Sequence, residues 1–367
     1  MKSLLHFAAY FSVSLGCLLM FSACDDELEV TAPEKPILAI YGILDPTAET
    51  QYVRVAEGFL TEEDAIEFAA LNDLSLPNAQ VFMTNEVNNF QTDTIYFSRV
   101  DTSKEPGAFN RDYTVFATSA AVQAGETYTL HVNVTDPADL SATATTTIPF
   151  ETNLFEPRDS VQAFGNQFDW SEVNFATNTQ LELEWRRSRE SGAEPEQVAA
   201  GFEVSAFIEV GIRLPNGDTL FQPPARFGPI GPITESRCIS GNDATICYPI
   251  AGPNVLSQWT TQFPDDLLGG RLVFEDFVKS EAVYFRIASL DRELLNYQNV
   301  NNPAFEDFST VNFEYTNVSV EGEGIGVGVF GSRNTETQYV RIAPCTQYNL
   351  RLNNQPQGAD CQDVLVD

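Results

Sequence analysis

The side chains that most often carry out chemistry in proteins are sparse or unpatterned in this sequence. It contains two histidines, His6 and His131, and 52 acidic residues. A Ser-His-Asp triad and an HExxH zinc site need histidines at fixed places, and His6 belongs to the leader segment described below. Acidic pairs of the kind used in glycoside hydrolysis occur, but chance alone supplies them among so many acids. We therefore predict no catalytic residue, no metal ligand and no cofactor; a calcium site built from separate loops stays open.

Four cysteines in the second half of the chain form two close pairs, Cys238 with Cys247 and Cys345 with Cys361. In an exported protein, such pairs favour disulfide bonds. Zinc is the alternative, but the spacings are long and no histidine lies near. We predict the bridges Cys238–Cys247 and Cys345–Cys361.

The prediction of export rests on residues 1–23. An apolar run follows a basic residue, and Ser22-Ala23 supplies the small side chains that a signal peptidase needs. This segment resembles a bacterial lipoprotein leader, which makes Cys24 the lipidated first residue; Phe21 departs from the usual Leu, Val or Ile. Cys17 is a weaker competitor because it would leave a short apolar run. A plain cleaved signal and an uncleaved helix are the alternatives, and the acids that follow argue against the helix.

The residues after the lipidation site form a short acidic tether, residues 24–36. Asp25, Asp26 and Glu27 resemble the surface-export signal of Bacteroidota lipoproteins, and a merely solvated acidic linker is the alternative. Several acyl chains on Cys24 would hold the chain at a membrane. We expect a lipid-anchored protein of the Gram-negative outer membrane, displayed on the cell surface.

Charge and length restrict the partners and the number of domains. Without the leader, the chain has 19 basic and 52 acidic residues, a net charge of −33, which repels nucleic acid. Its 43% hydrophobic residues, with 27 Phe and 12 Tyr, are typical of a folded protein rather than a disordered one. About 344 mature residues exceed what one core usually holds, so we predict two domains.

The first predicted domain, residues 37–150, is an immunoglobulin- or prealbumin-like β-sandwich. It contains about seven short strand patterns, and a short helix is expected after Thr61. Its clearest strand is GETYTLHVNVTD, where apolar residues alternate with polar ones that include His131. That alternation places one set of side chains on a buried face: Tyr128, Leu130, Val132 and Val134.

The second predicted domain, residues 151–367, is β-rich and sandwich-like with short helices, so the fold class is all-β. Pro215-Asn216-Gly217 indicates a hairpin, residues 223–232 read as a Pro/Gly loop, and residues 290–300 change period and predict a helix. GIGVGVFGS and TQYVRIA are expected to be two separate strands near the C-terminus. Four aromatics could stack on sugar rings, although core packing is favoured: Phe168, Trp170, Trp259 and Phe263.

Several motifs resemble those of envelope lipoproteins grouped as domain of unknown function 4249. They are ILAIYGIL, PNAQVFM, GAFN and GETYTLHV in the first half, and SLDRELLNYQ and NVSVEGEGIGVGVFGS in the second. Cys247 is followed by Tyr248, where the family often has Trp. The resemblance covers nearly all of the mature chain and carries over no catalytic residue. It implies assemblies beside TonB-dependent transporters.

The sequence thus favours a non-enzymatic outer-membrane lipoprotein that acts as a binding or accessory subunit of a TonB-dependent transporter. A glycan or a peptide is the expected ligand. A secreted-type glycan hydrolase or peptidase is one alternative and would need acids clustered in a cleft. A structural or adhesion module is another and would need a broad apolar or aromatic patch.

Overall fold

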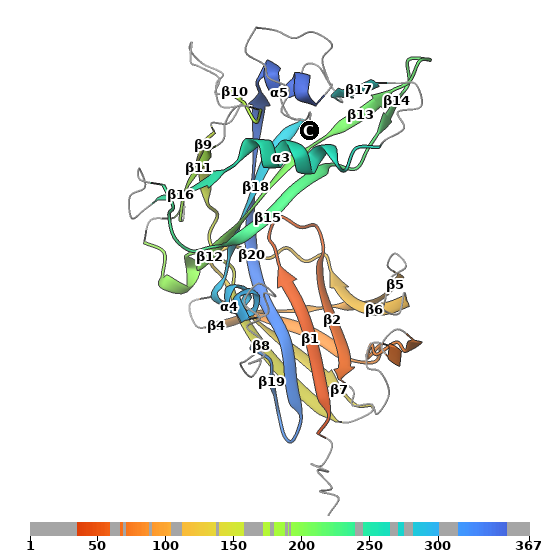
Figure 1. Ribbon diagram of the computed structural model, residues 1–367. Coiled ribbons are helices and arrows are strands. Elements are labelled where there is room, and N and C mark those ends of the chain that lie inside the picture. The colour runs from red at the N-terminus through yellow and green to blue at the C-terminus, as the bar shows by residue number, and fades with distance from the viewer. Residues whose placement is uncertain are drawn as a thin grey trace, which may run out of the picture. The chain divides into compact units, whose positions relative to one another are not determined.

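The computed structural model describes most of the chain after residue 34 (Figure 1). The described residues are 35–58, 67–68, 71–87, 90–103, 112–136, 139–157, 172–176, 180–187, 190, 192–238, 245–264, 271–274, 282–300 and 315–350. The predicted leader, Cys24 and Cys361 lie outside them, as do Trp170 and most of the helix expected after Thr61. Within these ranges, no helix is long and apolar enough to cross a membrane.

Strands dominate the described residues, as the sequence predicts, and the helices are short. The strands are β1 Ile37–Leu44, β2 Gln51–Gly58, β3 Gln80–Val87, β4 Phe90–Tyr96, β5 Ser98–Ser103, β6 Asp112–Thr118, β7 Thr127–Val134, β8 Leu140–Thr147, β9 Asn153–Glu156, β10 Glu172–Val173, β11 Leu181–Arg186, β12 Gly201–Ile208, β13 Val210–Arg213, β14 Thr219–Phe221, β15 Ala225–Ile233, β16 Thr245–Ile250, β17 Arg271–Phe274, β18 Val283–Leu290, β19 Ser319–Val320 and β20 Ile325–Ile342. The helices are η1 Pro195–Gln197, α3 Gly252–Thr260, α4 Arg292–Val300 and α5 Pro344–Asn349.

The first part of the fold is a β-sandwich. One layer is the sheet β19-β8-β7-β3-β4, and the other contains β20, β1, β2, β6 and β5 of a nine-stranded sheet. A core of apolar side chains from both layers lies between them, and the even-numbered residues of β7 are buried in it as their alternation predicts. Val318 and Phe330 also belong to this core, so the C-terminal part of the chain completes the sandwich. The domain boundary near residue 150 stays a prediction.

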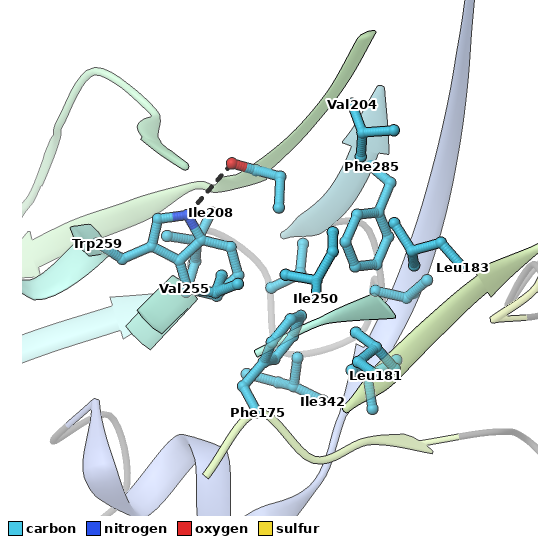
Figure 2. Close-up of a cluster of buried hydrophobic side chains, with 14 of the residues drawn as sticks. Phe175, Leu181, Leu183, Val204, Ile208, Ile250, Val255, Trp259, Phe285 and Ile342 are labelled. Atoms are coloured by element: carbon cyan, nitrogen blue, oxygen red, sulfur yellow. Dashed lines mark hydrogen bonds between the residues drawn. The ribbon is translucent and has the colours of Figure 1, made fainter. Parts of the chain in front are cut away.

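A second core lies beneath the other end of the nine-stranded sheet, where the strand order is β15-β12-β18-β20. Helix α3 and the sheet β16-β11-β9 contribute to this core, and Figure 2 shows Trp259 among Phe175, Val255 and Ile208. The Trp259 side chain is fully buried and its Nε1–H donates to the carbonyl oxygen of Ala206 at 3.2 Å. Trp259 is therefore a core residue and not a sugar-stacking platform.

Strand β20 connects both cores, and here the prediction of two separate strands was wrong. It runs unbroken for 18 residues, pairs parallel with β1 through Ser332 and antiparallel with β18 from Arg333 onward. Phe330 and Val340 lie on its buried face, so alternation turns the odd-numbered residues to the opposite face. Gly328 has φ +100°, and a Cβ there would collide with the carbonyl oxygen of Ile40. The glycine-rich motif thus allows a close approach of β20 to β1.

A Pro/Gly loop was predicted over residues 223–232, but residues 225–233 form the edge strand β15. Strand β15 pairs with β12 through two register shifts, and Gly228 and Gly231 lie at these irregularities. Proline lacks an N–H donor and is tolerated at the edge of a sheet and at bulges. The prolines and glycines are typical of a loop, but at this edge position the chain stays extended.

Helix α4 confirms the helix predicted over residues 290–300, whereas α3 and α5 were not predicted. Helix α4 lies against the outward face of the nine-stranded sheet: a Cβ on Gly331 would come within 2.9 Å of the Leu294 Cβ. Leu294 also packs with Ala288 and Leu290 of β18 in a small cluster of its own. In α3, the buried spacing Val255, Leu256 and Trp259 was a helical signal that the short length of the segment obscured.

Candidate functional site

The candidate site lies at the N-terminus of α4 and is organised by Asp291. This residue directly follows β18, and its backbone N–H donates to the carbonyl oxygen of Ser332 at 3.0 Å. The Leu294 N–H donates to Asp291 Oδ1 at 2.8 Å. Asp291 is therefore the N-cap of α4, a role that suits aspartate because its carboxylate accepts an otherwise unpaired helix N–H.

Burial makes this carboxyl unusual. Asp291 is 3% exposed, and Thr146 of β8 donates to its Oδ2 at 2.5 Å. Loss of solvation raises the pKa of Asp291 to about 6, although the hydrogen bonds from Thr146 and from the N–H groups of Leu294 and Ser332 oppose the rise. The carboxyl therefore exchanges its proton in a weakly acidic range where most aspartates are ionised.

A chain of buried polar groups extends from Asp291 between β8 and β20. Thr146 Oγ1 lies 2.9 Å from Ser332 Oγ, and Ser332 Oγ donates to the carbonyl oxygen of Thr147 at 3.0 Å. Further along β20, Asn334 Nδ2 donates to the carbonyl oxygen of Pro149 at 3.0 Å. These bonds join the β8 segment of one sandwich layer to β20 of the other and fix the position of the Asp291 carboxyl.

A pocket of about 400 Å³ opens beside this network. The pocket is lined by side chains of both charges. Arg292 has an exposed guanidinium group, Arg187 a half-buried one, and Glu293 a half-buried carboxylate. Arg187 Nη2 donates to the carbonyl oxygen of Thr234 at 2.9 Å, which restrains that guanidinium. The lining residues are Thr145, Thr146, Thr147, Arg187, Pro195, Val198, Ala199, Ala200, Asp291, Arg292 and Glu293.

The Glu293 carboxylate is held by Tyr315. The Tyr315 hydroxyl donates to Glu293 Oε2, and burial together with this carboxylate raises the pKa of Tyr315 to about 12. Glu293 is therefore paired with a neutral donor. The pocket offers a small polar ligand two guanidinium groups, the carboxyl groups of Asp291 and Glu293, and threonine hydroxyls.

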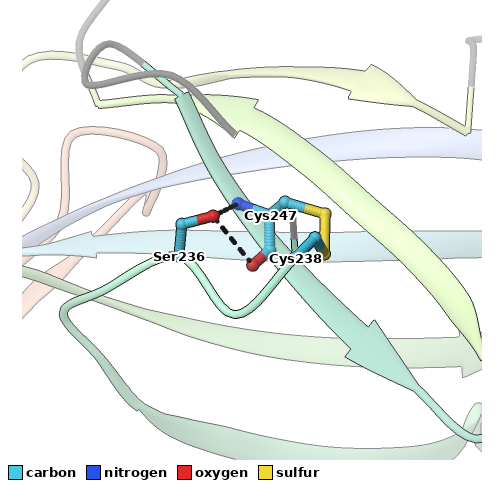
Figure 3. The surroundings of a disulfide bond; sticks show 3 residues. All are labelled: Ser236, Cys238 and Cys247. Atoms are coloured by element: carbon cyan, nitrogen blue, oxygen red, sulfur yellow. Dashed lines mark hydrogen bonds between the residues drawn. A yellow bond between two sulfur atoms is a disulfide. The ribbon is translucent and has the colours of Figure 1, made fainter. Parts of the chain in front are cut away.

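Of the two predicted disulfides, Cys238–Cys247 is present in the structure, with an S–S distance of 1.99 Å and a Cα–Cα distance of 5.3 Å (Figure 3). Ser236 Oγ accepts from the Cys247 N–H at 3.1 Å beside the bridge. Cys345 is also disulfide-bonded, while its pairing with Cys361 stays a prediction because Cys361 lies outside the described residues. This Cys238–Cys247 bridge is not among the residues that line the pocket.

The Glu182 carboxylate lies close to the two sulfurs of this bridge, with the three potential ligand atoms within 4.8 Å of one another. Metal ions bind cysteine as the thiolate, and both sulfurs here are joined to each other. The intact bridge therefore offers a metal no thiolate, so this group does not form a metal site.

His131 lies on the half-exposed face of β7, as its alternation predicts. Its ring stacks on Phe82 with a centroid distance of 4.8 Å, and Nε2 lies 3.3 Å from Thr84 Oγ1. Partial burial lowers the pKa of His131. The residue packs within its own sheet and does not reach the pocket beside Asp291.

The fold and the site define an all-β protein of sandwich class with a mixed-charge pocket beside a buried carboxyl. The chain matches the family described as Domain of unknown function (DUF4249) over residues 25–339 and therefore belongs to that family. No curated protein matches the chain. The pocket was not predicted from the sequence, although Asp291 followed by an amphipathic run was a recognisable helix-start signal.

Proposed function

We propose that this protein is a non-enzymatic binding subunit, anchored by lipid in the outer membrane, that serves a TonB-dependent transporter. The pocket beside Asp291 is the observation that supports a binding role. Its volume of about 400 Å³ falls within the range of small-ligand pockets. The buried carboxyl is occupied by donors of the chain itself, which favours a positioning role for Asp291 over proton transfer to a substrate.

The charges around the pocket favour a short peptide as its ligand. The guanidinium groups of Arg187 and Arg292 suit a terminal carboxylate, because guanidinium can donate two parallel hydrogen bonds to it. The Glu293 carboxylate suits an amino group. A neutral glycan would use the threonine hydroxyls but neither set of charges.

The leader and the acidic tether support the anchor and the partner. A tether of about thirteen residues spans roughly 20 Å as a flexible chain, so the folded part could contact a neighbouring membrane protein without leaving the bilayer. Tethering also raises the effective concentration of the two proteins for each other. We propose that residues 151–367 face the transporter.

Crosslinking in intact cells, followed by mass spectrometry of a tagged chain, tests the partner. We expect crosslinks from residues 151–367 to a TonB-dependent barrel, and their loss with Cys24→Ser, which releases the chain from the membrane. Crosslinks only to peptidoglycan, or only through residues 38–149, contradict the proposal.

Calorimetric titration with dipeptides and tripeptides tests the ligand. Arg292→Gln removes one exposed charge at the pocket and is expected to weaken peptide binding about tenfold. Arg213→Gln is the matched control, because Arg213 is an exposed arginine of β13 outside the pocket. Binding of neutral oligosaccharides that Arg292→Gln leaves unchanged would contradict the peptide assignment.

A further inference from the structure

A second group of side chains lies on the outward face of the nine-stranded sheet, across β15, β12, β18 and β20. The strand register places Arg226 opposite Phe207, Phe207 opposite Tyr284, and Tyr284 opposite Tyr339. Arg286 lies two residues further along β18. Their chain neighbours Ala206 and Phe285 belong to the buried core, so alternation turns this group outward. We call it the arginine–aromatic cluster: Phe207, Arg226, Tyr284, Arg286 and Tyr339.

The aromatic rings of the cluster form a packed row. Phe207 stacks on Tyr284 with a centroid distance of 5.1 Å and an interplanar angle of 14°, and Tyr284 contacts Tyr339 at 5.4 Å. Tyr284 is 4% exposed. Burial, together with the Glu209 carboxylate at its hydroxyl, raises the pKa of Tyr284 to about 12. The row is therefore rigid, and the Tyr284 hydroxyl stays protonated.

Two exposed guanidinium groups rest on this row. The Arg286 Cζ lies 4.9 Å from the Phe207 ring centroid and 5.3 Å from that of Tyr284. The Arg226 Cζ lies 5.8 Å from the same Phe207 ring. A guanidinium on an aromatic ring keeps its N–H edges directed to solvent, where they can donate to an anion.

The backbone of Arg226 is fixed from the side. Gln262 accepts from the Arg226 N–H at 2.9 Å and donates through Nε2 to the Arg226 carbonyl oxygen at 2.7 Å. Arg226 Nη2 also reaches Ser205 Oγ at 3.5 Å. Pre-arranged side chains lose less entropy when a ligand binds.

The placement of the two guanidinium groups favours an anionic ligand. The chain carries 52 acidic and 20 basic residues, yet within the described part neither Arg226 nor Arg286 forms a salt bridge. The Glu209 carboxylate at the Tyr284 hydroxyl supplies one negative charge beside these two positive ones, so the cluster keeps an excess of positive charge. Beyond about 10 Å, salt screens the negative field of the remaining protein, so the local pair can still attract an anion.

We propose that the arginine–aromatic cluster binds a carboxylate-bearing saccharide, such as a uronate chain. Guanidinium groups pair with carboxylates in bidentate geometry. Next to them, β20 supplies the hydroxyl groups of Thr337, opposite Arg286, and of Tyr339, which suit sugar hydroxyls. Because the cluster runs across four neighbouring strands, it favours an extended chain over a compact molecule. This site is distinct from the pocket beside Asp291.

Calorimetric titration of the full-length chain in detergent with oligogalacturonate, starting at about 0.1 M salt, tests the proposal. We expect binding that falls at least about tenfold in the Arg226→Gln/Arg286→Gln variant and that weakens as salt rises. Methyl-esterified oligogalacturonate has the same sugar chain without the charges and is expected not to bind. The double variant is expected to keep its unfolding midpoint, because both arginines are exposed.

The matched control is Arg99→Gln/Arg213→Gln, which removes the same charge from exposed arginines of β5 and β13 and is expected to bind like wild type. Equal binding of the esterified chain, or equal binding by the Arg226→Gln/Arg286→Gln variant, would overturn the proposal. So would failure to bind oligogalacturonate at millimolar concentration. Tighter binding of poly-glutamate than of oligogalacturonate would also overturn it, since the partner would then be an acidic protein segment.

Discussion

The buried carboxyl of Asp291 is expected to make the stability of the protein fall as pH rises through the weakly acidic range. Its pKa is about 6 in the folded chain against an ordinary value of 3.8, so the folded state holds the proton more tightly than the unfolded state. The stabilisation is fully present below pH 4 and is lost as pH rises through 6. Two pKa units correspond to about 3 kcal/mol.

Asp291→Asn isolates this effect from the other acidic residues. Asparagine caps a helix about as well as aspartate, and like a protonated carboxyl it can donate to Thr146. Thr146 can then donate to Ser332 Oγ, which donates to the Thr147 carbonyl oxygen. The hydroxyl groups of Thr146 and Ser332 therefore both keep a hydrogen-bond partner. We expect the variant to gain about 3 kcal/mol relative to wild type between pH 4 and pH 7.

Urea unfolding of both proteins at pH 4, 5, 6 and 7 measures this difference. Asp101→Asn is a control of opposite sign, because Arg99 and Thr114 lower the pKa of exposed Asp101. Wild type should therefore gain stability relative to Asp101→Asn as pH rises toward about 4, so this pair is also measured at pH 2 and pH 3. A difference between wild type and Asp291→Asn that stays constant across this range would refute the reasoning.

Three further predictions concern the fold, each measured by urea unfolding. Gly328→Ala should destabilise the chain by more than about 2 kcal/mol, because φ is positive there and the new Cβ would meet the carbonyl oxygen of Ile40 in β1. The control Gly322→Ala, at φ +89° in open space, should cost about 1 kcal/mol. Trp259→Ala should cost about 3–5 kcal/mol by opening a cavity in the second core. Replacing both cysteines of the Cys238–Cys247 bridge by serine should cost roughly 3 kcal/mol, since the bridge closes a short loop; an unchanged midpoint would show that the loop is ordered without it.

The structure could be predicted best from the sequence where a local pattern of residues decides it. In β7 the alternation of Tyr128 to Val134 identified the buried face, because one face of that strand meets only the core. The Cys238–Cys247 bridge was predicted from the spacing of the two cysteines together with the expected export. Helix α4 followed from a change of period after β18.

Features set by long-range pairing were not predictable in this way. Strand β15 contains two Gly-Pro pairs, Gly228-Pro229 and Gly231-Pro232, and its place at the sheet edge lets this pattern stay extended. The unbroken run of β20 depends on two partners, β1 and β18, that are distant in sequence. The pocket joins β8 with the start of α4, and the hydrogen bond from Thr146 to Asp291 spans 145 positions of the chain.

The change of partner along β20 explains why the buried carboxyl and the pocket occur together. Strand β1 pairs with β20 up to Ser332, and β18 pairs from Arg333 onward, so both partner strands end at this point. Each is followed by an aspartate. Asp45, after β1, accepts from Arg333 Nε at 2.8 Å and from Thr335 Oγ1 at 3.0 Å. Asp291, after β18, accepts from the neutral donors Thr146 and Leu294, and within the described residues its carboxyl has no salt bridge where β8, β18 and β20 meet.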